Sequence, residues 1–181
     1  MVAVAVVARW LPHPPNFTPL AALALFAGAT MARPWVSAAM IVTAMLISDT
    51  LLGFHGLMPL VYGCLLWNVW IGHRCLAGRF AGTGLRRAMV IAGGSLVGSL
   101  AFFGLTNLGC WWSFYPHTSA GLLACYTAAI PFFQYTVAGD LCFAGLFFAA
   151  HAIASRPAGL PSLANVRVLS GQRQVLLAER R

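Results

Sequence analysis

The stretch WVSAAMIVTAMLISDTLL, from Trp35 to Leu52, contains a single charged residue, Asp49, and is otherwise apolar or weakly polar. A run of this kind is typical of a transmembrane helix, because about 20 apolar residues are needed to cross a hydrocarbon core ~30 Å thick. Leu57 to Leu76 and Arg87 to Thr106 have the same character. These runs predict a protein that crosses a membrane several times.

The composition of the whole chain of 181 residues leads to the same conclusion. Hydrophobic residues make up 60% and charged residues 8%, and the mean hydropathy is +0.82. These values lie far outside the range of a soluble domain. All eleven basic residues are arginines and the net charge is +8, but apolar runs separate them, so they form no cationic face with interleaved aromatic residues. We therefore expect an integral membrane protein that binds lipid and no nucleic acid.

Three other apolar runs complete the expected bundle. Leu20 to Met31 is shorter than a full span and needs neighbouring helices to complete the crossing, and Val2 to Leu11 is expected to form a short or tilted first helix. Ser119 to His151 is too long for one straight crossing, since it would extend ~50 Å at ~1.5 Å per residue. Pro131 is expected to break or kink this run, with an interfacial or re-entrant piece before it and a span after it.

The predicted fold is therefore all-α, with about six transmembrane helices, of which the first is short and the last is broken near Pro131. Residues 1–154 form the transmembrane domain and residues 155–181 a basic cytoplasmic tail. Ten arginines fall on one side of this bundle, namely Arg33, Arg74, Arg79, Arg86, Arg87, Arg156, Arg167, Arg173, Arg180 and Arg181. Only Arg9 lies on the other side, so the positive-inside rule predicts that both termini are cytoplasmic.

The three connections on the outer side have a different composition. They are Pro12 to Pro19, Gly53 to Gly56 and Thr106 to Thr118, and they contain His13, His55 and His117, respectively. Turn formation and an interfacial aromatic belt would explain their prolines and glycines and residues such as Trp111 and Tyr115 without any ligand. The other interpretation is a ligand-binding surface, in which the proline-rich first connection forms a lid because proline restricts the backbone.

Two carboxylates lie within the predicted helices, Asp49 and Asp140. An acid inside the bilayer costs a few kcal/mol on insertion scales and usually faces a cavity or a partner. Neither acid has an evident basic partner inside the membrane. Asp49 is expected near the outer end of its helix, within reach of the outer connections, and Asp140 at mid-depth. A buried hydrogen bond that ties helices together and a functional site are both open as explanations.

A metal site is a further alternative at the outer side. Cys110 is predicted to share an outer connection with His117, and thiolate and imidazole together bind borderline metals. His13 and His55 complete the candidate ligands, if the connections converge. The five cysteines are odd in number and lack paired short spacings, so packing as small hydrophobes is the simpler explanation.

No catalytic or phosphate-binding motif occurs in the chain: there is no Gly-x-Ser-x-Gly, no His-Glu-x-x-His and no glycine-rich phosphate loop. An enzyme is therefore not expected, although an intramembrane enzyme that uses one of the two acids is kept as a weaker alternative. Gly94 and Gly98 form a small-residue seam that lets two helix backbones approach closely. This seam could hold the bundle together or dock a second membrane protein.

Three strings carry a resemblance to a known group of proteins: PNFTPLAALALFAGA at Pro15 to Ala29, SDTLLGFH at Ser48 to His55, and TN with YPHTSAGLLACYTAAIPFFQYTVAGDL between Thr106 and Leu141. They resemble an uncharacterised family of small bacterial inner-membrane proteins. In size, six-helix layout and topology, that family is similar to the substrate-binding S components of energy-coupling factor transporters, including solitary cobalamin-type ones. This chain departs from them in its very short first helix.

The resemblance implies a protein that captures a vitamin-like or cofactor-like molecule at the outer face of the inner membrane. In S components the outer loops cover the ligand site, and helix faces of small residues meet an energising module. The resemblance marks matched polar positions at Asn16, Thr18, Asp49, His55, Asn107, Tyr115, Thr118 and Asp140. With Trp111 and His117 added from the composition of the outer connections, the expected ligand-binding residues are Asn16, Thr18, Asp49, His55, Asn107, Trp111, Tyr115 and His117. Asp140, Gly94 and Gly98 are expected to serve coupling or helix packing. Cobalamin is a candidate as substrate, and a flavin, thiamine or a queuosine-like molecule are others. The alternative is a membrane assembly or interaction protein without transport activity, with another membrane protein as its partner.

Overall fold

The computed structural model describes residues 2–10, 14–78 and 84–155, and the regular secondary structure in these ranges is entirely helical. The helices, in chain order, are α1 (Val2–Trp10), α2 (Leu20–Thr30), α3 (Pro34–Leu52), α4 (Met58–Ile71), the π-helical turn η1 (Gly72–Leu76), α5 (Leu85–Phe114) and α6 (Ser119–Ala154). The chain divides into two compact units, Met1–Ala150 and His151–Arg181. The predicted all-α bundle is confirmed.

Three of the helices, α3, α5 and α6, are each long and apolar enough to cross a membrane. α2 is apolar but has only 11 residues, and the 14 residues of α4 run without interruption into the five of η1. Large apolar side chains remain exposed on these helices, among them Trp35, Leu100 and Leu146. Such exposure is costly in water and favourable in lipid, so the surface fits a membrane protein.

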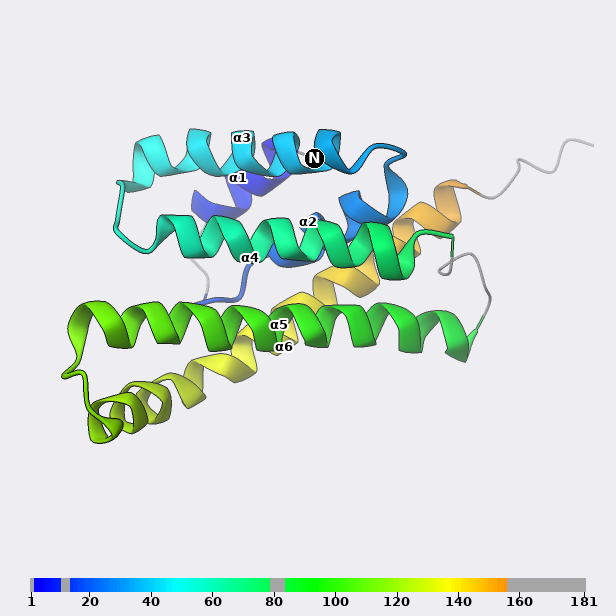
Figure 1. Ribbon diagram of the computed structural model, residues 1–181. Coiled ribbons are helices and arrows are strands. Elements are labelled where there is room, and N and C mark those ends of the chain that lie inside the picture. Colours follow the sequence, from blue (N-terminus) through cyan, green and yellow to red (C-terminus); the bar gives the residue numbers. More distant parts are fainter. Residues whose placement is uncertain (1, 11–13, 79–83, 156–181) are drawn as a thin grey trace, which may run out of the picture. The chain divides into compact units, whose positions relative to one another are not determined.

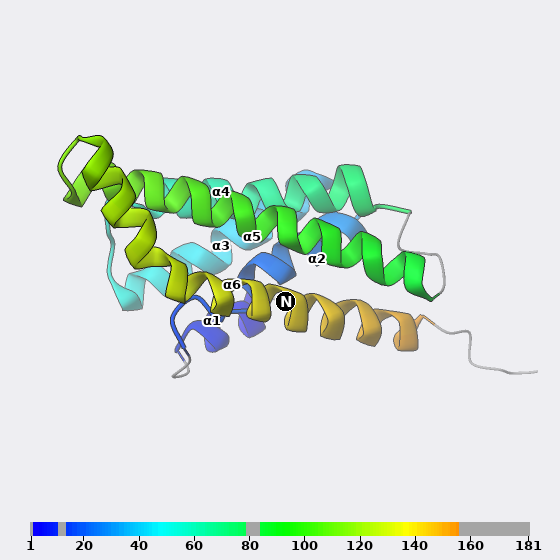
Figure 2. The same ribbon diagram turned by 90° about the horizontal axis from the view of Figure 1, so that it is seen from below.

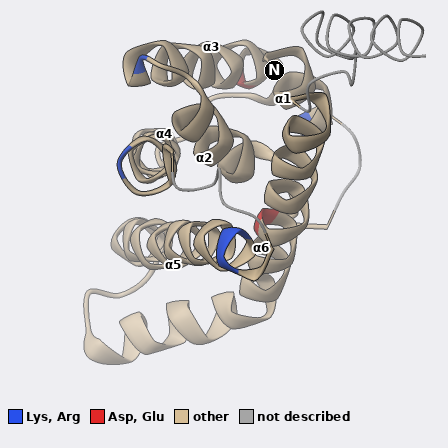
Figure 3. Ribbon diagram, turned by 90° about the vertical axis from the view of Figure 1, so that its right-hand side faces the viewer, with Lys and Arg blue, Asp and Glu red and all other residues tan. Residues whose placement is uncertain are grey.

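The short helix α2 lies in the middle of the bundle, with α3, α4, α5 and α6 around it (Figure 3). Eight of its 11 residues are buried, and they lie all round the helix, which is typical of an enclosed element. A methyl group on Gly28 would collide with the carbonyl oxygen of Val69, and one on Gly72 with that of Leu25. The two glycines therefore let α2 and the end of α4 pack backbone against backbone.

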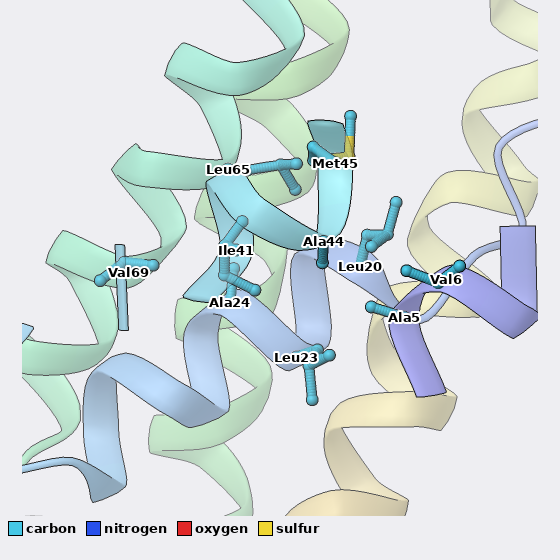
Figure 4. Packing of buried hydrophobic residues seen from close by; sticks show 10 residues of the cluster. All are labelled: Ala5, Val6, Leu20, Leu23, Ala24, Ile41, Ala44, Met45, Leu65 and Val69. Atoms are coloured by element: carbon cyan, nitrogen blue, oxygen red, sulfur yellow. The ribbon is translucent and has the colours of Figure 1, made fainter. Parts of the chain in front are cut away.

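Two clusters of buried apolar side chains meet at α2. The first joins α1, α2, α3 and α4 and consists of Ala5, Val6, Leu20, Leu23, Ala24, Ile41, Ala44, Met45, Leu65 and Val69 (Figure 4). The second joins α2, α4, η1, α5 and α6 and consists of Ala22, Leu25, Ala29, Ile71, Leu76, Ile91, Ala144 and Phe148. Because α2 contributes to both clusters, it connects the two sides of the bundle.

The boundary predicted after the fifth helix is wrong. A connection was expected from Thr106 to Thr118, but α5 continues to Phe114, and only the four residues before Ser119 separate it from α6. The tryptophans and asparagine that indicated an interfacial loop do not stop a helix. The first proline after the start of α5 is Pro116, and the helix ends just before it, as expected for a residue that cannot donate a backbone hydrogen bond.

Pro131 does not divide the last helix into two elements. Helical structure continues through it from Ser119 to Ala154. In Figure 2, α6 changes direction in its yellow-green part. A proline inside a helix removes one backbone donor and its ring displaces the carbonyl four residues earlier, which bends the helix. The bend, and not a break, is how this long run is accommodated.

Candidate functional site

The two ends of the bundle differ in their charged residues. The α3–α4 and α5–α6 connections lie at one end, and the α2–α3 connection and the start of α5 lie at the other (Figure 1). The second end contains Arg33, Arg74, Arg86 and Arg87, and blue segments appear there at the ends of α3, α4 and α5 in Figure 3. Arg79 and the five arginines from Arg156 onward are outside the described residues.

A cavity of about 310 Å³ lies between the α1–α2 connection and the surrounding helices. Its polar lining comes from four separate parts of the chain and consists of Arg9, Asn16, Thr18, His55, Thr136 and Asp140. The remaining described lining is apolar and consists of Leu20, Ala21, Met45, Leu52, Val61, Leu65 and Phe102. A few polar groups in an otherwise apolar wall is the usual composition of a small-molecule site.

A second cavity, of about 260 Å³, adjoins the first. The two share the side chains of Asn16, His55, Val61, Phe102 and Thr136. The second cavity adds Thr106, Asn107 and Cys110 from α5 to the polar lining. The Asn107 amide donates to the carbonyl oxygen of Phe103 at 2.8 Å, which fixes its orientation within the helix.

The α1–α2 connection is held over the first cavity by its own turn and by α6. Asn16 has a φ of +64°, a left-handed conformation that asparagine tolerates better than most residues, and the Phe17 amide donates to Pro14 at 3.0 Å. The Phe17 ring packs on Phe143, with ring centroids 5.5 Å apart. A methyl group on Gly139 would lie 3.3 Å from the Phe17 Cα, so this glycine lets the connection approach α6 immediately beside Asp140.

Asp49 is held in place by two partners. Its Oδ1 atom forms an ion pair with Arg9 Nη1 at 2.6 Å, and its Oδ2 atom accepts a hydrogen bond from the Tyr62 hydroxyl at 2.6 Å. The same Arg9 nitrogen lies 2.6 Å from the Ser48 hydroxyl oxygen. The prediction that Asp49 lacks a basic partner is therefore wrong, because the folding of α1 against α3 brings Arg9 to it. Asp49 holds the arginine that lines the cavity and is not itself part of the described lining.

Asp140 is in a different electrostatic environment, although its side chain is also buried. The Ser99 hydroxyl donates to its Oδ2 atom at 2.6 Å, and the residue is 4% exposed. Among the described residues, no arginine or histidine lies within 4.0 Å of this carboxylate. Asp140 therefore presents a carboxylate to the cavity with a hydroxyl, and no cation, as its polar partner.

Three of the residues predicted from the sequence to bind a ligand lie at the α5–α6 turn and belong to neither cavity lining. Trp111 donates to the carbonyl oxygen of Pro116 at 3.0 Å, and the His117 Nε2 atom lies 2.8 Å from the carbonyl oxygen of Trp112. The His117 and Trp112 rings stack with centroids 4.6 Å apart. These contacts stabilise the turn itself, and Tyr115 lies at its start.

The candidate metal ligands do not converge in the part of the chain that is described. No group of three or more His, Cys, Asp or Glu side chains occurs there. His55 and Cys110 line the second cavity, His117 lies at the α5–α6 turn, and His13 is outside the described residues. The described part of the chain thus does not bring the candidate metal ligands together.

Gly94 and Gly98 face inward, toward neighbouring helices. A methyl group on Gly98 would collide with the Asn68 side-chain oxygen, and one on Gly94 would lie 2.9 Å from a methyl of Leu76. This seam packs α5 against α4 and η1 within the bundle.

Sequence reasoning missed the apolar wall of the first cavity and two of its polar residues, Arg9 and Thr136. Arg9 was the single arginine on the outer side, and that exception was the signal for a paired or functional residue. Thr136 precedes Asp140 by four residues, so the two share one face of α6.

Comparison with known proteins gives one family. A model described as a family of unknown function, DUF6580, matches residues 1–163. No curated protein and no solved structure matches the chain. The matched range includes every residue of the cavity lining described above.

Proposed function

Because this chain belongs to the DUF6580 family, whose function is unknown, we propose a function from its own residues: capture of a vitamin-like or cofactor-like small molecule, as a substrate-binding subunit or a small transporter. The observation that carries the proposal is the cavity of about 310 Å³, which six polar side chains line within an otherwise apolar wall. A mostly apolar wall with a few polar groups is typical of a ligand site.

The distribution of charge supports an outward-facing cavity in the inner membrane of a bacterium. Four described arginines lie at the end of the bundle away from the α3–α4 connection, which contributes His55 to the cavity. Arg9 is the exception to this pattern, and its charge is offset by Asp49. The positive-inside rule then favours a cytoplasmic arginine end and an outer cavity end, with both termini in the cytoplasm.

The likeness to S components of energy-coupling factor transporters supports the same role. The likeness concerns size, six-helix layout and topology, with outer loops that cover the ligand site in S components. It implies an energising module as the partner of this chain. The adjoining volumes of about 310 and 260 Å³ favour a ligand near the lower end of the ~300–1,000 Å³ range of such sites. A molecule of vitamin size fits this range.

The experiment is mass spectrometry of small molecules that co-purify with the full chain in mild detergent. Thr136 lines both cavities, so Thr136→Phe is expected to remove the bound molecule, whereas Thr127→Phe on the exposed face of the same helix keeps it. Size-exclusion chromatography checks that both variants remain folded. The absence of any enriched molecule, together with no thermal shift from a panel of vitamins, would contradict the proposal. A stoichiometric protein partner retained by both variants would then favour the assembly role.

A further inference from the structure

We infer that the ligand of this cavity is an organic cation and that Asp140 binds its positive group. The inference rests on the proposed function and adds the chemical class of the substrate. Among the described residues of the lining, Asp140 is the charged group that no opposite charge offsets.

The two charged residues of the lining differ in what surrounds them. Arg9 lies 2.6 Å from Asp49, so these two charges offset each other. Asp140 is 4% exposed, accepts from Ser99 at 2.6 Å, and has no basic side chain within 4.0 Å among the described residues. When Asp49 is counted with the described lining, there are two carboxylates and one arginine. The negative charge of Asp140 is therefore not balanced by a positive one.

A buried carboxylate inside a membrane bundle is costly, and a cation bound beside it offsets that cost. Such a cation gains from the low dielectric constant of its surroundings, because the attraction between opposite charges is weakly screened there. A neutral ligand would leave the carboxylate unpaired, and an anionic ligand would be repelled by it. The charge of the lining thus selects among molecules of similar size.

The rest of the lining favours an organic cation over a metal ion. The described residues contain no group of three metal-binding side chains, and a volume of about 310 Å³ is much larger than an ion requires. Met45, Leu65 and Phe102 offer apolar surface, and an aromatic face such as that of Phe102 also attracts cations. A molecule with an apolar body and one positive group matches both the apolar side chains of the lining and the Asp140 carboxylate.

The test measures both the charge of the molecule that co-purifies and the charge preference of the purified protein. The probes are thiamine and choline as cations, nicotinamide as a neutral molecule and pantothenate as an anion, each added in a thermal-shift titration. Asp140→Asn removes the charge at constant shape, and Asp140→Glu keeps it. The expected result is a cationic co-purifying molecule, stabilisation by a cationic probe alone, and at least ~tenfold weaker binding to Asp140→Asn than to Asp140→Glu.

Each other outcome overturns the inference in a way that separates it from the proposed function. A neutral or anionic molecule that co-purifies leaves the proposed function standing and overturns the inference. Equal binding of a cation to the wild-type protein and to Asp140→Asn does the same. Absence of any co-purifying molecule and of any response to the probes overturns both. The wild-type measurements decide the charge of the ligand even if Asp140→Asn fails to fold.

Discussion

The Arg9 guanidinium and the Asp49 carboxylate form an ion pair with an N–O distance of 2.6 Å that joins the first helix to the third. The Asp49 side chain is 1% exposed and that of Arg9 16%, so the pair is largely removed from solvent. Tyr62 donates to the second carboxylate oxygen and so ties α4 to the same group. A first helix of only nine residues is thereby fastened to the bundle by a polar contact as well as by apolar packing.

The ion pair predicts strong coupling between its two partners. Asp49→Asn is expected to lower the free energy of unfolding by roughly 2–5 kcal/mol, because it leaves the arginine without an opposite charge in a largely buried place. Arg9→Met is expected to have a similar effect, and the double variant to be clearly less destabilised than the sum of the two. Denaturant or thermal unfolding in detergent without ligand measures all three. Additive effects would show that the two side chains do not act as a pair.

His55 and His117, at the end of the bundle with the α3–α4 and α5–α6 connections, are expected to differ in their effect on binding. His55 lines both cavities, whereas His117 stacks on Trp112 at the α5–α6 turn. His55→Ala should therefore reduce the amount of co-purifying small molecule, and His117→Ala should leave it unchanged. Quantitative mass spectrometry of equal amounts of protein compares them. Loss of the molecule only in His117→Ala would mean that the ligand lies at the turn and not in the cavity.

Gly139 and Gly145 provide a matched pair on α6. A side chain at Gly139 would press on the backbone of Phe17, while nothing lies within 4 Å of a methyl group on Gly145. Gly139→Val is expected to displace the α1–α2 connection, to cost about 1–3 kcal/mol of stability and to weaken ligand retention. Gly145→Val should have a much smaller effect on both stability and ligand retention. Thermal unfolding and ligand mass spectrometry measure the two effects, and equal behaviour of the two variants would contradict this role for Gly139.

The proposed orientation predicts which residues face the outside of the cell. In a cysteine-free background, a cysteine at Gly56 in the α3–α4 connection should react with a membrane-impermeant maleimide in intact cells. A cysteine at Leu85, at the start of α5, should react only after the cells are permeabilised. Both positions are exposed in the folded chain. If the maleimide does not react with one of them in intact cells, the membrane and not the fold blocks the reagent. The opposite pattern would invert the proposed topology and place the cavity at the cytoplasmic side.

Much of the bundle could be predicted because hydropathy is a local property. The run from Trp35 to Leu52 partitions into lipid by virtue of its own side chains, and the start and end of α3 follow it closely. The end of α5 and the course of α6 could not be read in this way. Whether Asn107 ends a helix, or whether Pro131 breaks or bends one, depends on the neighbours that satisfy the backbone there.

The sequence by itself determined an all-helical membrane protein, the grouping of its arginines and the presence of two buried acids, since each of these follows from composition along the chain. Only the tertiary structure decided what the acids do. Asp49 and Asp140 look alike in sequence, but the packing of α1 on α3 gives Asp49 an arginine, while Asp140 meets Ser99 and a cavity. The physical reason is that the energy of a charge buried at low dielectric depends mainly on its nearest partner. That partner lies on another helix, so only the tertiary structure shows it.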